Sequence, residues 1–301
     1  MENKLTNDFE KLYGNLYDAM VAENKKNFKD LFTRQVEKDG ISSFTTIKGR
    51  KYDSNVNLRF MMVGRAVNGW DERRYYSDNM TKDEFVKSSM CNFTNQKEAL
   101  SDNHSSDNEM RDRFEWIRNF EKDDRRVAPK NIFRKGIDKN SEEEMEAHPY
   151  YLSRPIWGYT EKIWCQLNNC INNKNISDHQ AWEERWYENI VWSNLFKIAP
   201  ASGGNPNKSL RKQQLEACKE LLKAEINEFN PTHVLFLTNW DGWFDHFNDE
   251  YSFDYNNKED YVAGSGKYKN SKMVVAVRPE RKPKEVYLEK VMKAFDAIKI
   301  K

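Results

Sequence analysis

The sequence lacks the features that mark export or membrane insertion. It contains no run of about 18 apolar residues, the length that a membrane-spanning helix requires. Residues 1–20 carry charges throughout, whereas a signal peptide has an uninterrupted apolar core. We therefore expect a cytoplasmic protein without a membrane partner.

Metal-binding patterns are also missing. None of Cys91, Cys165, Cys170 and Cys218 belongs to a CxxC pair, and the five histidines form no HxxxH or HxH pair. Such spacings bring several ligands to one ion. We expect reduced, partly buried thiols, no metal site and no cofactor.

An excess of charge of one sign is absent as well. The net charge of +1 disfavours a protein that coats long nucleic acids, so any contact with nucleic acid must be local. Charged residues make up 32% of the chain, which predicts a polar surface, but the 13% of aromatic residues supply the large areas that a core buries. The chain is thus predicted to fold.

Apolar runs alternate with amphipathic stretches along the chain. Compact apolar runs are typical of buried parallel strands, and they occur at residues 58–63, 190–192, 232–238 and 272–277. Helical spacing of apolar residues predicts helices at 6–35, 210–229 and 283–298, with shorter ones near 82–87, before 167 and around 239–247. Thr81 and Ser209 are the predicted N-caps.

Strands that alternate with helices predict a parallel sheet with right-handed crossovers. We expect one α/β domain over residues 1–301, a three-layer α/β/α arrangement around a central parallel four-stranded sheet. A helical N-terminal extension (1–57) and a long polar insertion (91–150) complete it. The oligomeric state is not predicted.

Three predicted strands end in unusual residues, and ligands of open α/β sheets bind at the carboxyl ends of strands. GRAVNGWDERR (64–74) combines glycines with an amide, an indole and a carboxylate, although a glycine turn with the indole covering the core explains it equally well. The residues concerned are Gly64, Arg65, Asn68, Gly69, Trp70 and Asp71.

The other two strand ends offer an amide and several cations. Asn194 can donate to and accept from the edge of a base, although such a residue more often ties two loops together. The GGNPN loop that follows could hold a phosphate on its N–H groups, but it does not match the P-loop pattern. RPERKPK (278–284) could attract phosphates or simply be a solvated charge run.

Together and in this order, these segments resemble the uracil-DNA glycosylase superfamily, its iron–sulfur-bearing bacterial branch in particular. The matching segments are FMMVGRAVNGWD, WSNLFKIAPASGGNPN, LEACKELLKAEINEFNPTHVLFLT and MVVAVRPER. They cover residues 58–71 and about 190–295, and 191–238 is the most specific part. The resemblance implies a protein that binds a base, a nucleotide or single-stranded DNA, and whose catalysis, if present, hydrolyses an N-glycosidic bond in DNA repair.

The resemblance also assigns roles and shows departures. Asn194 matches the residue that reads the uracil edge, and Arg278 stands where the family has a histidine. Arg65 and Ala66 occupy the place of the family's acid or amide, and the cluster cysteines are missing, so no iron–sulfur cluster is expected.

The resulting hypothesis is a divergent hydrolase with Asn68 or Asp71 orienting water. Its catalytic residues are Asn68, Asp71, Asn194 and Arg278, and its substrate-binding residues are Gly64, Arg65, Gly69, Trp70, Trp157, Lys197 and Asn205. Two alternatives stay open: a non-catalytic binding module on the same fold, and a nucleotide or sugar-phosphate hydrolase that uses the GGNPN loop.

Overall fold

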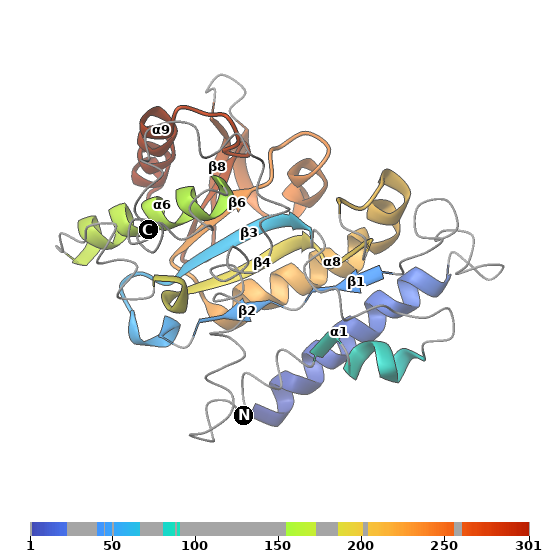
Figure 1. Ribbon diagram of the computed structural model, residues 1–301. Helices are drawn as coiled ribbons and strands as arrows, with labels where there is room; N and C mark the ends of the chain where they lie inside the picture. The colour runs from blue at the N-terminus through green and yellow to red at the C-terminus, as the bar shows by residue number, and fades with distance from the viewer. Residues whose placement is uncertain are drawn as a thin grey trace, which may run out of the picture.

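The chain forms a mixed α/β fold around one seven-stranded sheet (Figure 1). The computed structural model describes residues 2–22, 41–44, 46–49, 51–66, 81–87, 89–90, 155–172, 186–200, 204–255 and 261–300. The predicted insertion at 91–150 lies outside these residues, and so do Asn68, Gly69, Trp70 and Asp71.

Four parallel strands form the middle of the sheet, in the spatial order β4-β3-β6-β9. Each overlaps one of the predicted apolar runs, because helices cover both faces of the sheet and leave few positions for polar side chains. These strands are β3 (Phe60–Ala66), β4 (Ile190–Phe196), β6 (His233–Leu237) and β9 (Ser271–Ala276).

Antiparallel strands extend the sheet beyond the predicted four. β2 (Ile47–Lys48) pairs with β4 at one edge, and β8 (Val262–Tyr268) and β7 (Ser252–Tyr255) follow β9 at the other. β1 (Ile41–Ser43) and β5 (Ile198–Pro200) form a separate two-stranded sheet.

The sequence interpretation missed these edge strands. The N-terminal 57 residues are not wholly helical, and the polar segment before Asn270 contains β7 and β8. β8 (VAGSGKY) holds two glycines and only part of it is buried, so it shows neither a continuous apolar run nor a clear alternation.

Two helices lie against each face of the sheet. α1 (Glu2–Ala22) and α8 (Lys208–Phe229) share a core with the odd-numbered side chains of β3, such as Met61 and Val63. α6 (Pro155–Asn172) and α9 (Lys284–Ala297) pack with the even-numbered ones, such as Met62. No helix in the described ranges is both long and apolar enough to cross a bilayer.

The helix ends show which polar residues act as caps. The Thr81 prediction is confirmed, because its hydroxyl and backbone N–H both bond Glu84 in a capping box before the helix at 82–87. The Ser209 prediction is wrong: α8 begins at Lys208, and Oδ1 of Asn207 accepts from Leu210 N at 2.8 Å.

Three short 3-10 helices complete the described elements. The predicted helix around 239–247 is instead a turn followed by η5 (Phe244–Glu250). The others are η1 (Tyr52–Ser54) and η4 (Trp186–Asn189).

Candidate binding site at the carboxyl ends of the parallel strands

The parallel strands create a switch point in the sheet. The chain lays down β3, then β4 on one side of it, and then β6 on the other side. In open α/β sheets, the crevice outside the strand ends at such a reversal is where ligands bind. Gly64 and Asn194 lie near the ends of β3 and β4, and Arg278 follows β9.

Gly64 and Asn194 are paired across β3 and β4, and their side-chain positions face the same way. A Cβ atom at Gly64 would lie only 2.4 Å from Asn194 Oδ1, so this position must be glycine if the amide is to keep its place. The Asn194 side chain is 2% exposed, and its Nδ2 has no hydrogen-bond partner. Asn194 thus holds a buried donor that no described residue satisfies.

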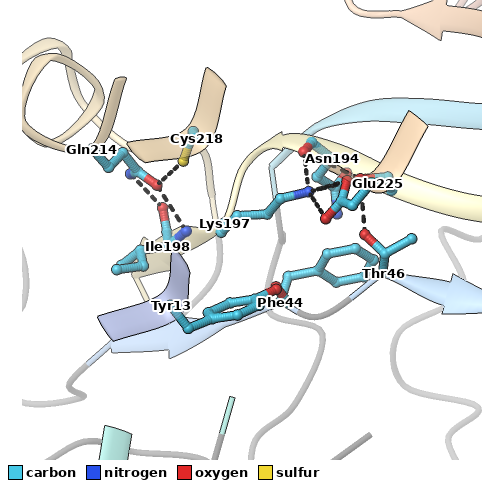
Figure 2. Close-up of polar contacts among 10 residues, drawn as sticks. Tyr13, Phe44, Thr46, Asn194, Lys197, Ile198, Gln214, Cys218 and Glu225 are labelled. Atoms are coloured by element: carbon cyan, nitrogen blue, oxygen red, sulfur yellow. Dashed lines mark hydrogen bonds and ion pairs between the residues drawn. The ribbon is translucent and has the colours of Figure 1, made fainter. Parts of the chain in front are cut away.

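Lys197 lies behind Asn194 and has no exposed surface (Figure 2). Its Nζ donates to the Asn194 carbonyl oxygen at 2.8 Å and to Ser193 Oγ at 2.7 Å, and it forms an ion pair with Glu225 at 2.8 Å. The structure therefore places Lys197 in the interior, although the sequence suggested contact with substrate. It is a positioning residue that fixes the backbone of Asn194.

Further hydrogen bonds complete this buried cluster (Figure 2). Ser193 Oγ donates to Glu225 Oε2 at 2.6 Å, and Thr46 Oγ1 donates to Ser193 Oγ at 3.1 Å. Next to it, the Gln214 side chain both donates to and accepts from the backbone of Ile198, each at 2.9 Å. On the side of β4 that faces α8, the polar side chains named above thus all form hydrogen bonds with one another or with the backbone.

Two arginines and an indole lie at the same end of the sheet. Arg65 Nε donates to the Thr238 carbonyl oxygen at 2.8 Å, and Arg211 Nη1 donates to the Gly242 carbonyl oxygen. Both guanidinium carbons lie 4.6 Å from the ring centroid of Trp243. We call Arg65 and Arg211 the arginine pair.

The turn after β6 places Gly242 and Trp243. Asn239 adopts a positive φ of 65°, and Gly242 one of 71°. Asn239 Oδ1 accepts from the backbone N–H of Arg278 at 2.7 Å, which ties the end of β6 to the end of β9. The turn thereby brings Arg278 to the same end of the sheet as the arginine pair.

Arg278 differs from the arginine pair because it has a carboxylate partner. Its Nη2 forms an ion pair with Glu280, while its Nε is buried without a hydrogen-bond partner. Burial, followed by the charges of Arg278 and Arg211, lowers the pKa of Arg65 to about 10, and Glu280 opposes this shift. Arg65 is thus close enough to Arg278 and to Arg211 for their charges to act against its own.

The remaining predicted residues are placed differently. Trp157 is 7% exposed and packs edge-on against Trp192, with ring centroids 4.7 Å apart, so its ring belongs to the core. Asn205 is exposed before α8. Asn68, Gly69, Trp70 and Asp71 lie outside the described residues, so their roles stay predictions.

Sequence reasoning missed Arg211, Trp243 and Asn239. Arg211 reads as an ordinary cation on an amphipathic helix, and Trp243 fell within a segment predicted to be helical. Neither belongs to a motif, so only the path of the chain reveals that they meet Arg65.

The thiols and acids of the described residues offer no metal centre. Cys165 and Cys218 are buried, Cys170 is exposed, and none of the three forms a disulfide bond, whereas Cys91 lies outside the described ranges. Burial raises the pKa of Cys218 to about 12, which makes this thiol a poor ligand or nucleophile. In the part of the chain that the structure describes, no three His, Cys, Asp or Glu side chains gather around a common point.

Comparison with protein-family models, curated proteins and solved structures finds no match to this chain.

Proposed function

We propose that this protein binds a nucleobase-containing ligand, a nucleotide or a short single strand of nucleic acid, at the carboxyl ends of β3 and β4. The buried, unpaired amide of Asn194 carries the proposal. An unsatisfied buried donor costs about 1–3 kcal/mol, and a ligand carbonyl would remove that cost. An amide offers a donor and an acceptor, which complement the edge of a base such as uracil.

The surroundings of Asn194 support this assignment. Gly64 leaves room for Asn194 Oδ1, and Lys197 donates to the Asn194 carbonyl oxygen. Two further residues of the family-like motifs thus hold the Asn194 side-chain amide in place. Helices on both faces of a sheet with a parallel centre agree with the three-layer α/β/α arrangement that the resemblance to uracil-DNA glycosylases implies.

Hydrolysis of an N-glycosidic bond requires a further group that orients water. Among the described residues no carboxylate is bonded to Asn194, and Arg65 stands at the family's acid position. Asn68 and Asp71, which lie outside the described residues, are the candidates that would orient the water. We therefore propose binding as the function and treat base excision as a separate measurement.

The test is calorimetric titration of the protein with free nucleosides and with single strands containing uracil, hypoxanthine or xanthine. We expect Asn194→Ala to weaken binding about ten- to hundredfold, the loss that one or two hydrogen bonds to a buried site predict. Gly64→Ala should weaken binding similarly, because its Cβ displaces Asn194. Base release is followed in the same samples.

Asn227→Ala is the matched control, because Asn227 is an exposed amide near the opposite end of α8. It should bind like the wild type. Equal affinities in the wild type and Asn194→Ala would refute the proposal. Base release by the wild type that Asn194→Ala abolishes would extend the proposal to a glycosylase.

A further inference from the structure

The arginine pair holds positive charge that no ion pair within the described residues neutralises. Neither Arg65 nor Arg211 forms an ion pair; their contacts in the described structure are one backbone carbonyl each and the shared Trp243 ring. Three guanidinium groups, counting Arg278, face one carboxylate, that of Glu280. Within the described residues, the pair therefore leaves two charges without an ion pair at this end of the sheet, in a chain whose net charge is only +1.

A purely structural role explains one arginine better than two. A guanidinium over an indole gains only a modest attraction at an exposed site. The second arginine gains the same contact but is repelled by the first, and both are partly desolvated. Two like charges held together in this way are stabilised when an anion lies between or beside them.

The geometry leaves donors for such an anion. Each guanidinium has five N–H groups and, in the described structure, donates one hydrogen bond to the backbone, Arg65 to Thr238 and Arg211 to Gly242. The backbone bond and the indole contact fix each plane, so less freedom is lost when it binds. Planar, fixed guanidinium groups suit bidentate contacts with phosphate.

We propose that Arg65 and Arg211 bind the terminal phosphate of a nucleotide, a phosphomonoester; this rests on the proposed function, which supplies the base at Asn194. The charge favours a monoester, because its dianion balances two arginines, whereas a phosphodiester carries a single charge.

The position of Arg65 links the two sites. Gly64 and Arg65 are consecutive in β3, so their side-chain positions lie on opposite faces of the sheet. Gly64 faces Asn194, and Arg65 faces Trp243. A base and a phosphate joined by one sugar would thus lie on the two sides of the end of β3, at the switch point between β3 and β6.

The experiment titrates three ligands at constant ionic strength: inorganic phosphate, a nucleoside and its 5′-monophosphate. The variants are Arg65→Gln, Arg211→Gln and the double variant. Each single change should weaken binding of phosphate and of the monophosphate about ten- to hundredfold, as expected for charged hydrogen bonds. Nucleoside affinity should stay unchanged.

Lys212→Gln is the matched control, because Lys212 neighbours Arg211 on α8, is exposed, and loses the same charge. It should leave phosphate binding unchanged. Arg211→Lys keeps the charge but loses the fork of donors, so it should also weaken phosphate binding while the circular dichroism spectrum stays that of the wild type. This second variant keeps the test valid if a glutamine variant misfolds.

The outcomes separate this inference from the proposed function. Phosphate binding that survives in the double variant, or falls equally in Lys212→Gln, overturns the arginine site. A dinucleoside monophosphate that binds as tightly as the 5′-monophosphate overturns the choice of a monoester. Phosphate binding without nucleoside binding overturns the base at Asn194, and with it the nucleotide as ligand.

Discussion

The two clusters of charge beside α8 differ in how they are neutralised. Lys197 and Glu225 are 0% and 1% exposed, and the lysine ammonium meets a carboxylate, a hydroxyl and a carbonyl oxygen. Arg65 and Arg211 are half-buried, and neither forms an ion pair with a carboxylate of the described residues. The first cluster lies behind β4, and the second lies at the end of β3 and β6.

This difference separates a structural cluster from a binding site. Moving a charge out of water is costly, and a fully buried ion pair persists only when its hydrogen bonds are satisfied within the protein. The Lys197 cluster meets that condition without any ligand. The arginine pair has no such carboxylate partner among the described residues, and this is why we propose that a bound anion balances its charge. Substitutions in the Lys197 cluster should therefore lower the free energy of unfolding. Substitutions in the arginine pair should instead weaken ligand binding and change stability little.

The largest effect is expected from Lys197→Met, which leaves Glu225 buried without its cation. Removing one partner of a buried ion pair typically costs about 3–5 kcal/mol of the free energy of unfolding. The loss should appear in urea denaturation as a lower midpoint.

The double variant Lys197→Met/Glu225→Leu is the control. It removes both charges together and should recover most of the lost stability, because apolar residues often replace a buried ion pair at little cost. A loss below about 1 kcal/mol in the single variant would contradict the structural role of this pair.

Glu161 tests what happens when a buried charge has no partner at all. It lies on α6, is 1% exposed, and neither carboxylate oxygen has a hydrogen-bond partner among the residues that the structure describes. Burial raises its pKa to about 7, although Lys162 and Lys284 act in the other direction. The folded protein therefore binds more protons than the unfolded chain between about pH 4.5 and 7, and this group makes stability fall as the pH rises through that window.

Glu161→Gln removes this titration. Relative to the wild type, the variant should gain about 3 kcal/mol in free energy of unfolding above pH 7, and the difference should shrink towards zero near pH 4.5. Urea denaturation at pH 5 and pH 8 measures it. A difference that does not change with pH would contradict the raised pKa.

A second buried group, His233, also makes stability depend on pH, so the Glu161→Gln variant must be compared with the wild type at each pH. Burial, followed by the charge of Lys272, lowers the pKa of His233 to about 4, so this group favours the fold above about pH 6.5 and loses that contribution as the pH falls. Its effect opposes that of Glu161 but is shared by the wild type and Glu161→Gln. The difference between them therefore isolates the carboxyl group.

The sequence predicted part of the surroundings of the Lys197 cluster, but it did not predict the arginine pair. Strands buried on both faces read as apolar runs, which is why β3, β4, β6 and β9 could be predicted. Asn194 and Lys197 belong to one short motif at a strand end. Arg65 and Arg211, however, come from a strand and from a helix far along the chain, and nothing in the local pattern of either indicates the other.

Local ambiguity explains the smaller errors. Asn207 and Ser209 are both good N-caps, and propensity alone does not choose between them; the structure selects Asn207. β8 contains glycines and lies near the edge of the sheet, where only part of it is buried. Few of its positions therefore require an apolar residue, and its sequence shows no strand pattern. Such elements are set by their neighbours rather than by their own residues.

The smallest effect on stability is expected at the arginine pair itself. Without phosphate, Arg211→Gln should change the free energy of unfolding by less than about 1 kcal/mol, because the lost contact with Trp243 is offset by the relief of repulsion from Arg65. With phosphate at about 100 times its Kd, the wild type should gain about 2.7 kcal/mol and the variant much less. Thermal unfolding with phosphate, against chloride of equal ionic strength, measures both quantities. A large loss of the free energy of unfolding without phosphate would show that Arg211, like Lys197, has a structural role. A difference that appears only with phosphate would show that Arg211 binds the ligand.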